Sequence, residues 1–418
     1  MKKKKKYLIL LIALCLLVLM PSKIVSAKPK RHTSGSCYWK IDASGTLTIW
    51  PKNKSGYLAS QSTWNEYRNF ITKVVVKPGV KAKNCGNMFR GFVHCREMDL
   101  SGLDTSMTTN MSCMFQDCSE LRYLDLSHFD TSHVESMDFM FYRCIELSAI
   151  DLSGFDTSNV KYMRSMFDNC FSLDDLDVST FNTEKVRNMT SMFSWCTNLS
   201  EIDVSNFNTS NVEYMQYMFS GCKKLENLNL SEFNTSNVIM MYDMFSHCDM
   251  LKAVDISGFD TKNVVSIENL FKGCSKLSKI VFGKNFRFSG KFKSSYLPKP
   301  SGDAYTGKWI RKDGKYGPYK NKQLIRNYTG KMHGKWTWEK KKVKSSRKKR
   351  KRADEKKETK MDQIYDFLDC KHMNAHYGKV AVQYDGGVYM LIFADHHADI
   401  LGQLAVSTML YPNTYLAI

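Results

Sequence analysis

The sequence lacks three signals that would place the protein in a familiar functional class. After residue 20 it has no apolar run of the roughly 20 residues that a transmembrane helix needs, so no membrane-spanning helix is predicted. Its repeats carry no enzymatic motif and no motif for a metal or cofactor, so we expect neither catalysis nor a bound cofactor. The C-terminal end carries no sorting motif, which leaves the mode of anchoring at a cell surface open.

What the chain does have at its start is an export signal. Lys2 to Lys6 form a basic region, Tyr7 to Met20 form an apolar one, and Val25-Ser26-Ala27 supplies the small residues of a cleavage site. This order is typical of a secretory signal peptide. We therefore predict that residues 1–27 are removed by cleavage after Ala27, and that the protein is exported to the cell surface or secreted.

A single repeat dominates the chain. The pair Met-Phe, or Leu-Phe in its last copy, recurs every 26 residues without slippage. Its copies begin at Met88, Met114, Met140, Met166, Met192, Met218, Met244 and Leu270. The common pattern is M-F-x-x-C-x-x-L-x-x-L-D-L-S-x-F-D-T-S-x-V-x-x-M. A fixed period of this length is the signature of a solenoid, in which each unit buries its apolar side chains against its neighbours.

Two hydrophobic periods alternate within each repeat. Val160, Met163, Met166 and Cys170 recur at spacings of three and four, which predicts one apolar face of a helix. Leu176-Asp177-Val178-Ser179 alternates apolar and polar residues, which predicts a short strand. The predicted fold is therefore an α/β solenoid: a stack of 26-residue strand-turn-helix units with a parallel sheet.

The repeat resembles a known family. The pattern L-x-x-L-D-L-S-x-F-D-T-S-x-V-x-x-M-x-x-M-F-x-x-C is similar to the BspA-type leucine-rich repeat of bacterial surface proteins. The segments 37–49, 305–309 and 336–339 resemble the cap before and the segment after such repeats. The resemblance implies an exported surface protein. Some members of the family are thought to bind host matrix proteins or other bacteria.

The sequence divides by composition and charge. Residues 88–282 carry 15 Lys and Arg against 27 Asp and Glu, whereas residues 283–360 carry 27 against 6. We predict a β-rich N-terminal cap over residues 28–87 and the leucine-rich-repeat-like solenoid over 88–282. A small β-rich module or linker follows over 283–338, then a basic linker over 339–360 and a small α+β unit over 361–418.

One column of acidic residues lies within the predicted strands, between two inward apolar positions, and should therefore point out of the sheet. Its members are Asp99, Asp125, Asp151, Asp177, Asp203 and Asp255, and Asn229 interrupts it. They either accept hydrogen bonds from neighbouring N–H and Ser hydroxyl groups, or form an acidic strip that binds a basic partner. Calcium is disfavoured, because it needs six to eight oxygens at one point and each repeat supplies one carboxylate.

A neighbouring column points the same way and varies freely, which is how a solenoid builds a recognition surface. Its members are Tyr123, Ala149, Asp175, Glu201, Asn227, Ala253 and Lys279. We predict a binding surface on this sheet face, and the loops on the opposite side are an alternative. A second polar column, in which Asp and Asn interchange, is interpreted as turn acceptors. It comprises Asp104, Asp130, Asp156, Asn182, Asn208, Asn234 and Asp260.

One cysteine occupies the same place in seven successive repeats. These residues are Cys118, Cys144, Cys170, Cys196, Cys222, Cys248 and Cys274. Phe92 holds this place in the first repeat, so an apolar side chain suffices there, which argues against a metal ligand or nucleophile. We predict a ladder of buried free thiols that act as small hydrophobes. Any disulfide would involve the cysteines near the cap, which are Cys37, Cys85, Cys95 and Cys113.

The basic linker contains one dense cluster of cations, Arg347, Lys348, Lys349, Arg350, Lys351 and Arg352. It is either a solvated, self-repelling linker or a segment that adheres to anionic wall polymer, glycosaminoglycan or a membrane surface. The export signal argues against a nucleic-acid partner. Beyond it, Cys370 and the histidines of residues 361–418 match no catalytic or metal-binding spacing, and a hairpin is predicted around residues 385–387.

Three functions fit these observations. The first is an exported adhesin-like scaffold whose solenoid binds host matrix proteins or other cells, through an unidentified protein ligand and without catalysis. The second is a carrier that delivers a C-terminal toxin or hydrolase unit. The third is a wall-associated structural protein held by its basic segment. The sequence does not identify the ligand.

Overall fold

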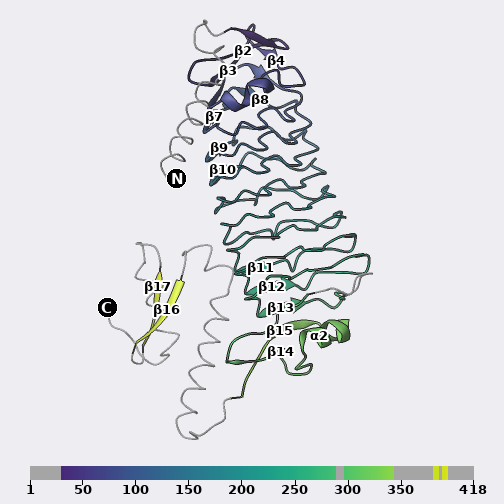
Figure 1. Cartoon of the computed structure of the whole chain (residues 1–418). Helices are drawn as coiled ribbons and strands as arrows, with labels where there is room; N and C mark the ends of the chain where they lie inside the picture. Colours follow the sequence, from purple (N-terminus) through teal and green to yellow (C-terminus); the bar gives the residue numbers. More distant parts are fainter. Residues whose placement is uncertain (1–29, 289–295, 343–379, 386–387, 394–418) are drawn as a thin grey trace, which may run out of the picture. The chain divides into compact units, whose positions relative to one another are not determined.

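The computed structural model describes residues 30–288, 296–342, 380–385 and 388–393. The chain divides into two compact units, Met1–Lys341 and Lys342–Ile418. Three regions discussed above lie outside the described residues: the predicted signal peptide at 1–27, the cation cluster at 347–352, and Cys370 with its neighbouring histidines, for which no site was predicted. The first unit is a β-solenoid of about nine turns with a repeat of about 26 residues and little helix (Figure 1).

The N-terminal end folds as two small sheets that continue into the solenoid. It contains β1 (His32–Ser34), β2 (Cys37–Ile41), β3 (Thr46–Pro51), β4 (Gly56–Tyr57), the 3₁₀ helix η1 (Asn65–Phe70), β5 (Lys73–Val76), β6 (Val80–Lys81), β7 (Glu97–Asp99) and β8 (Leu103–Asp104). The two sheets have the strand orders β1-β2-β3-β5-β7 and β4-β6-β8. The strands β1, β2 and β3 pair antiparallel, whereas β3, β5 and β7 pair parallel. Trp64 closes this end over the first repeat, because its ring stacks on Phe89 and its indole N–H donates to the carbonyl of Met88 at 2.8 Å.

The repeats pair through short parallel strands on one side of the stack. These strands are β9 (Tyr123–Asp125), β10 (Ala149–Asp151), β11 (Asn227–Asn229), β12 (Ala253–Ile256) and β13 (Lys279–Phe282). Equivalent residues face each other: Tyr123 pairs with Ala149, and Asp125 with Asp151. A second row of parallel bridges runs through Ser136, Tyr162 and Asn188 and continues to Ser266. Residues 175–177 and 201–203 hold the equivalent places without forming a strand.

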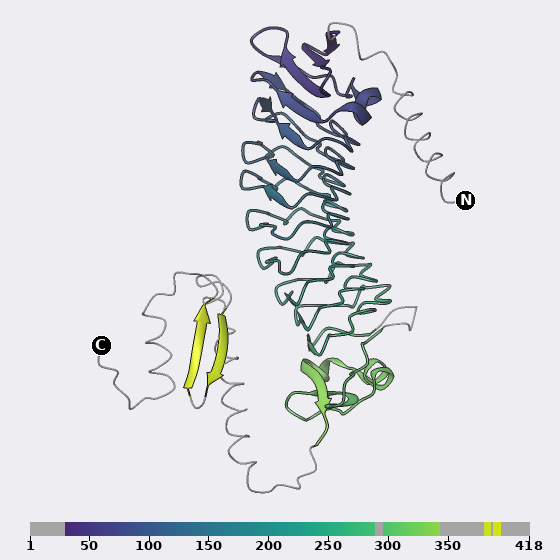
Figure 2. The ribbon, with the colours of Figure 1, turned by 60° about the vertical axis from the view of Figure 1, so that its left-hand side comes forward.

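The predicted helix is wrong: tight turns replace it (Figure 2). In the repeat around Met140, two successive turns close through Met140 N–H to Met137 O and Cys144 N–H to Phe141 O, at 3.2 and 3.1 Å. Their third residues, Phe139 and Arg143, have φ of 58° and 59°. An α-helix of L-residues excludes this left-handed conformation. The structure is therefore a β-solenoid and not a stack of strand-turn-helix units.

The backbone hydrogen bonds explain why this segment forms tight turns and not an α-helix. A helix satisfies its N–H groups internally, four residues back. Here alternate N–H groups bind the next repeat instead: Phe139, Phe141 and Arg143 donate to carbonyls 25 residues further on, at 2.7 to 2.9 Å. Successive four-residue turns also place their buried apolar residues three and four positions apart in the sequence. The helical period in the sequence is consequently the period of these turns, and the same bonds join each repeat to its neighbour.

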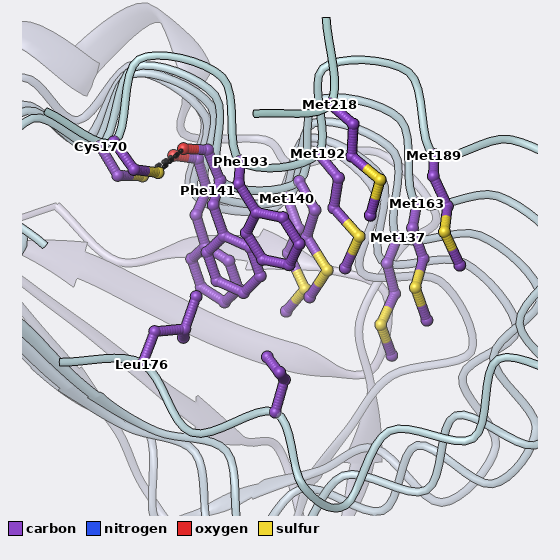
Figure 3. Packing of buried hydrophobic residues seen from close by; sticks show 14 of the residues in the cluster. Met137, Met140, Phe141, Met163, Cys170, Leu176, Met189, Met192, Phe193 and Met218 are labelled. Atoms are coloured by element: carbon purple, nitrogen blue, oxygen red, sulfur yellow. Dashed lines mark hydrogen bonds between the residues drawn. The ribbon is translucent and has the colours of Figure 1, made fainter. Parts of the chain in front are cut away.

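The core is a set of identical side chains stacked from turn to turn (Figure 3). The rings of Phe115 and Phe141 are nearly parallel, with centroids 5.5 Å apart, and Phe141 stacks on Phe167 at 5.4 Å. Methionines such as Met137 and Met140 form parallel columns beside them, fully buried. Each buried side chain of this size contributes about 1.5–3 kcal/mol. Since equivalent side chains pack on one another from turn to turn, each turn depends on its neighbours for stability.

The C-terminal end of the first unit covers the last open strand. It contains β14 (Tyr305–Arg311), helix α2 (Asn321–Asn327), the 3₁₀ helix η2 (Gly330–Met332) and β15 (Gly334–Lys340). β15 pairs antiparallel with β13, the last strand of the repeats, and β14 pairs with β15. An exposed parallel edge would invite association with other strands. The segment predicted as a module or linker over 283–338 thus extends the solenoid sheet.

The second unit is described only as a hairpin. β16 (Val380–Asp385) and β17 (Val388–Phe393) pair antiparallel across residues 386–387, where the sequence predicted a hairpin. Among the described residues of both units, no helix is long and apolar enough to cross a membrane.

Candidate recognition surfaces

The predicted sheet face, which we call the strand face, is exposed but discontinuous. Tyr123 is the most exposed large side chain on it, with 58% of its surface accessible, and Asp125 follows on the same strand. The remaining predicted binding residues are also exposed or half-buried on this side: Asp151, Asp175, Asp177, Glu201, Asp203 and Asp255. Two of the turns present these residues from loops, because residues 175–177 and 201–203 are not strands.

The strand-face carboxylates are engaged in local hydrogen bonds. Oδ1 of Asp125 accepts the N–H and the hydroxyl of Ser127 at 3.0 and 2.7 Å, and the bond from the hydroxyl holds the pKa of this carboxyl below its usual value. The same N–H contact, two residues on, recurs throughout the column, at Asp151, Asp177, Asp203 and Asp255. This column therefore stabilises the turn that follows each strand, whatever else it binds.

The second polar column also supplies turn acceptors, as predicted. Oδ1 of Asp130 accepts from the N–H of Ser132 at 3.0 Å, and Oδ1 of Asn182 accepts from the N–H of Glu184 at the same distance. Both side chains offer an oxygen in this position, so Asp and Asn interchange without loss of the bond.

The cysteine column is a ladder of buried free thiols, as predicted, with one further role. All seven side chains are fully buried and free. Each Sγ donates to the carbonyl of a phenylalanine one turn earlier, as from Cys170 to Phe141 at 3.1 Å (Figure 3). The four cap cysteines are also free thiols. Burial raises the pKa of the Cys222 thiol to about 12, and it raises the pKa of Cys170 well above the ordinary value. Such thiols are poor nucleophiles and poor metal ligands.

A second surface, on the loop side that the sequence analysis gave as the alternative, follows the tight turns. We call the outward side chains of these turns, and of the residues directly beside them, the turn face. Its aromatic members are Phe139, Tyr142, Tyr162, Phe171, Trp195, Tyr214, Tyr217 and Tyr242. All are exposed or half-buried, and Tyr162 is 43% accessible. The predicted helix gave no reason to group these side chains on one surface. Aromatic residues at positions outside the repeat consensus were the sequence feature that could have indicated it.

Aromatic and cationic groups contact each other on the turn face. The rings of Phe139 and Tyr142 meet edge to face at 5.7 Å, and the guanidinium of Arg164 lies 4.5 Å from the Phe139 ring centroid. Further along the stack, Tyr217 and Tyr242 form another edge-to-face pair at 5.1 Å. These contacts hold large side chains in fixed positions at the surface.

Charged groups on the turn face contact each other and are partly exposed. Nε of Arg143 lies 3.4 Å from a carboxylate oxygen of Asp117, and the backbone N–H of Arg164 donates to Asp138 at 2.7 Å. Asp168 differs from strand-face aspartates such as Asp125, whose pKa is lowered. Burial raises the pKa of Asp168 to about 6, even though Ser165 and Asn169 donate hydrogen bonds to it.

The geometry of the repeats agrees with a family comparison. A family described as "Mycoplasma protein of unknown function, DUF285" matches residues 83–201 and 191–290, which together span the whole solenoid. The match covers the repeat region, which is just under half of the chain. The 26-residue solenoid turn described above is the form that the matched region takes in this chain. No curated protein matches the chain.

Solved structures similar to this chain include two leucine-rich proteins. A leucine-rich repeat protein from Eubacterium ventriosum is 16% identical, with 62% of this chain and 87% of that chain covered and a TM-score of 0.24. A leucine rich cell surface protein from Faecalibacterium prausnitzii is 15% identical, with coverages of 65% and 100% and a TM-score of 0.21. At these TM-scores the chains do not superpose as wholes, and no functional conclusion follows from them.

Surface hollows lie at both ends of the repeats. One, of about 450 Å³, lies where the cap meets the first repeats and is lined by amide, hydroxyl and arginine side chains, including Asn65, Arg68 and Arg90. The other, of about 640 Å³, lies at the opposite end of the stack. Within the described ranges, no group of three or more His, Cys, Asp or Glu residues is placed to hold a metal ion.

Proposed function

We propose that this protein is an exported, non-catalytic recognition scaffold of the cell surface, whose repeats bind a protein of the host matrix or of another cell. The predicted signal peptide supports export. The thiol ladder supports a structural and not a catalytic use of the cysteines, because each of its side chains is fully buried in the core.

One observation carries the proposal: the turn face presents fixed pairs of exposed aromatic side chains beside arginine. Tyr, Trp and Arg supply most of the binding energy at protein interfaces, because they bury a large area at small entropic cost. The pairs Phe139–Tyr142 and Tyr217–Tyr242 are of this kind, and Arg164 lies over Phe139. A stack of identical turns holds such side chains rigidly, as repeat proteins do on their binding surfaces.

The strand face is the second candidate surface for the same function. It is favoured by the exposure of Tyr123 and by the variation along its column. The carboxylates of its aspartate column are less available, because each already accepts at least one hydrogen bond from the following turn, as Asp177 does from Ser179.

A binding measurement with the full chain tests the function and separates the two surfaces. Purified matrix glycoproteins and intact bacterial cells are passed over immobilised protein, and dissociation constants are compared for Y217A/Y242A and for Y123A. If the turn face binds, the double variant weakens binding by roughly 30-fold or more, equivalent to about 2 kcal/mol. Y123A then changes it by less than about twofold.

The opposite pattern, with loss of binding in Y123A alone, would assign recognition to the strand face. Circular dichroism of each variant excludes unfolding as the cause. Binding of the wild-type chain to none of these targets would refute the proposed function.

A further inference from the structure

The hollow at the C-terminal end of the solenoid is strongly basic. It lies where the turn after β13 meets η2 and the start of β15. Seven residues line it, namely Lys284, Asn285, Arg287, Thr329, Gly330, Lys331 and His333. Three of them are permanent cations and a fourth is a histidine, whereas no carboxylate lines the hollow. A depression of about 640 Å³ with this lining suits a ligand that carries several negative charges.

Hydrogen bonds and a close backbone approach hold Arg287 and Gly330 in place within the hollow. A Cβ at Gly330 would lie 2.0 Å from the carbonyl oxygen of Lys284 and 2.6 Å from a guanidinium nitrogen of Arg287, so only glycine fits this approach. The guanidinium is itself held, because its Nη1 donates to the carbonyls of Lys284 and Phe286 at 2.7 and 2.6 Å. The backbone N–H and carbonyl of Arg287 both bind the hydroxyl of Thr261 in the preceding turn.

Among the described residues, no carboxylate neutralises the cations of the hollow. Within the described part of the chain, neither Lys284 nor Lys331 has a carboxylate within ion-pair distance, and the Arg287 side chain binds only carbonyls. Elsewhere in the same unit such groups are paired, as Lys252 is with Glu226 and Arg311 with Asp313. Unpaired cations held around one depression leave their charge available to an external anion.

We propose that this hollow binds the sulfate or phosphate groups of an anionic polysaccharide. Arginine and lysine recognise such tetrahedral oxyanions through charge-assisted hydrogen bonds. Its exposed side chains and open form suit a passing polymer chain better than an enclosed small molecule. This site is distinct from the two candidate protein-binding faces and does not depend on them.

The distribution of charge directs a polyanion away from the repeats. Residues 88–282 carry a net charge of −12, which repels an anionic chain from the repeats. The cations of the hollow attract it, and the two effects together favour approach at an end of the solenoid. The solenoid would therefore meet a polyanionic matrix end-on, with its turn and strand faces left free.

A matched pair of charge variants tests the proposal in the full chain. K284Q/K331Q removes two cations from the hollow, and K322Q/R326Q removes two exposed cations from α2 in the same module. Binding to dextran sulfate and to dextran phosphate is measured by biosensor across salt concentrations, with neutral dextran as the blank. We expect K284Q/K331Q to weaken binding about tenfold and to lower the log–log salt slope by about two, since each contact releases about one counterion.

The control K322Q/R326Q should change affinity by less than about twofold. Equal losses in the two variants would overturn the site, because they would show that total charge decides binding, and so would unchanged binding in both. Binding to one dextran derivative alone supports the site and identifies whether sulfate or phosphate is recognised. Inorganic phosphate should compete with dextran phosphate in the wild-type chain, and circular dichroism monitors folding of each variant.

Discussion

The thiol of Cys170 donates a hydrogen bond to the carbonyl oxygen of Phe141, 3.1 Å away in the preceding turn. The same oxygen also accepts the backbone N–H of Cys144 at 3.1 Å. Each cysteine therefore fills a small space in the core and uses the second lone pair of a buried carbonyl. A thiol is a weak donor, but a buried carbonyl has few alternative partners. This combination explains why cysteine occupies the column instead of alanine or valine.

The first prediction concerns thiol reactivity. In the native protein a thiol reagent should label the seven ladder cysteines at least about 100-fold more slowly than in guanidinium chloride, because the reactive thiolate is suppressed by burial. Cys113, which is only half-buried, should react first among the described cysteines. Mass spectrometry of the digested, labelled protein assigns the sites. Fast labelling of Cys170 in the native state, or recovery of ladder cysteines as disulfides, would contradict the structure.

The second prediction concerns Gly221 and Trp195. A Cβ at Gly221 would lie 2.7 Å from the indole of Trp195, and the φ of Gly221 is 74°. Gly221→Ala should therefore lower the free energy of unfolding by about 2–4 kcal/mol, from left-handed strain and overpacking together. Gly314→Ala is the control, because Gly314 has φ of 72° with nothing near its Cβ, so it should cost only about 1–2 kcal/mol.

Urea denaturation measures both variants. In the double variant W195A/G221A the overpacking is relieved, so the second substitution should cost no more than Gly314→Ala does. If the two glycine substitutions cost the same in the wild-type background, the indole does not restrict Gly221.

The third prediction concerns left-handed residues other than glycine. Ser191 has φ of 55° in one of the tight turns. Ser191→Gly should raise the free energy of unfolding by about 0.5–1 kcal/mol, because relief of strain exceeds the added entropy of the unfolded chain. The same change at the exposed Ser200, which lacks positive φ, should be neutral or destabilising. Thermal unfolding distinguishes the signs, and destabilisation at both sites would argue against the turn geometry.

The fourth prediction concerns the pH dependence of stability. Burial raises the pKa of Asp168 to about 6, from 3.8 for the exposed group, so the folded state binds this proton more tightly than the unfolded state. The contribution of Asp168 to stability therefore falls as the pH rises from about 4 to about 6. Asp168→Asn should be more stable than the wild type by about 1–2 kcal/mol at pH 7, with allowance for partial exposure, and equally stable near pH 3.5.

Asp177→Asn is the matched control for the fourth prediction. Hydrogen bonds from Ser179 lower the pKa of Asp177, so this carboxylate stabilises the fold at neutral pH and loses that effect as the pH falls. Its replacement should destabilise the protein at pH 7. Denaturation at a series of pH values tests both variants, and a difference between Asp168→Asn and the wild type that does not vary with pH would refute the assignment.

The amino-acid sequence was sufficient to predict a solenoid and the content of its columns. A period of 26 residues without slippage allows only a stack, and the interchange of Asp and Asn at one position, as in Asp156 and Asn182, indicated a turn acceptor. The substitution of Phe92 for cysteine predicted an apolar, buried place in the first repeat, and the buried cysteine ladder bears this out. These inferences succeed because equivalent residues in a stack share one environment. The residue types found at one repeat position therefore indicate whether that position is buried or lies in a turn.

The choice between helix and turns depended on tertiary contacts. Apolar residues at spacings of three and four fit both, and the N–H groups of Phe139 and Phe141 bind a neighbouring repeat that no local pattern reveals. The aspartate, asparagine and glycine residues before several of the cysteines, such as Asp117, Asn169 and Gly221, were the local sign of left-handed backbone. The turn face and the basic hollow likewise arise from how successive turns meet, which is a property of the packed stack.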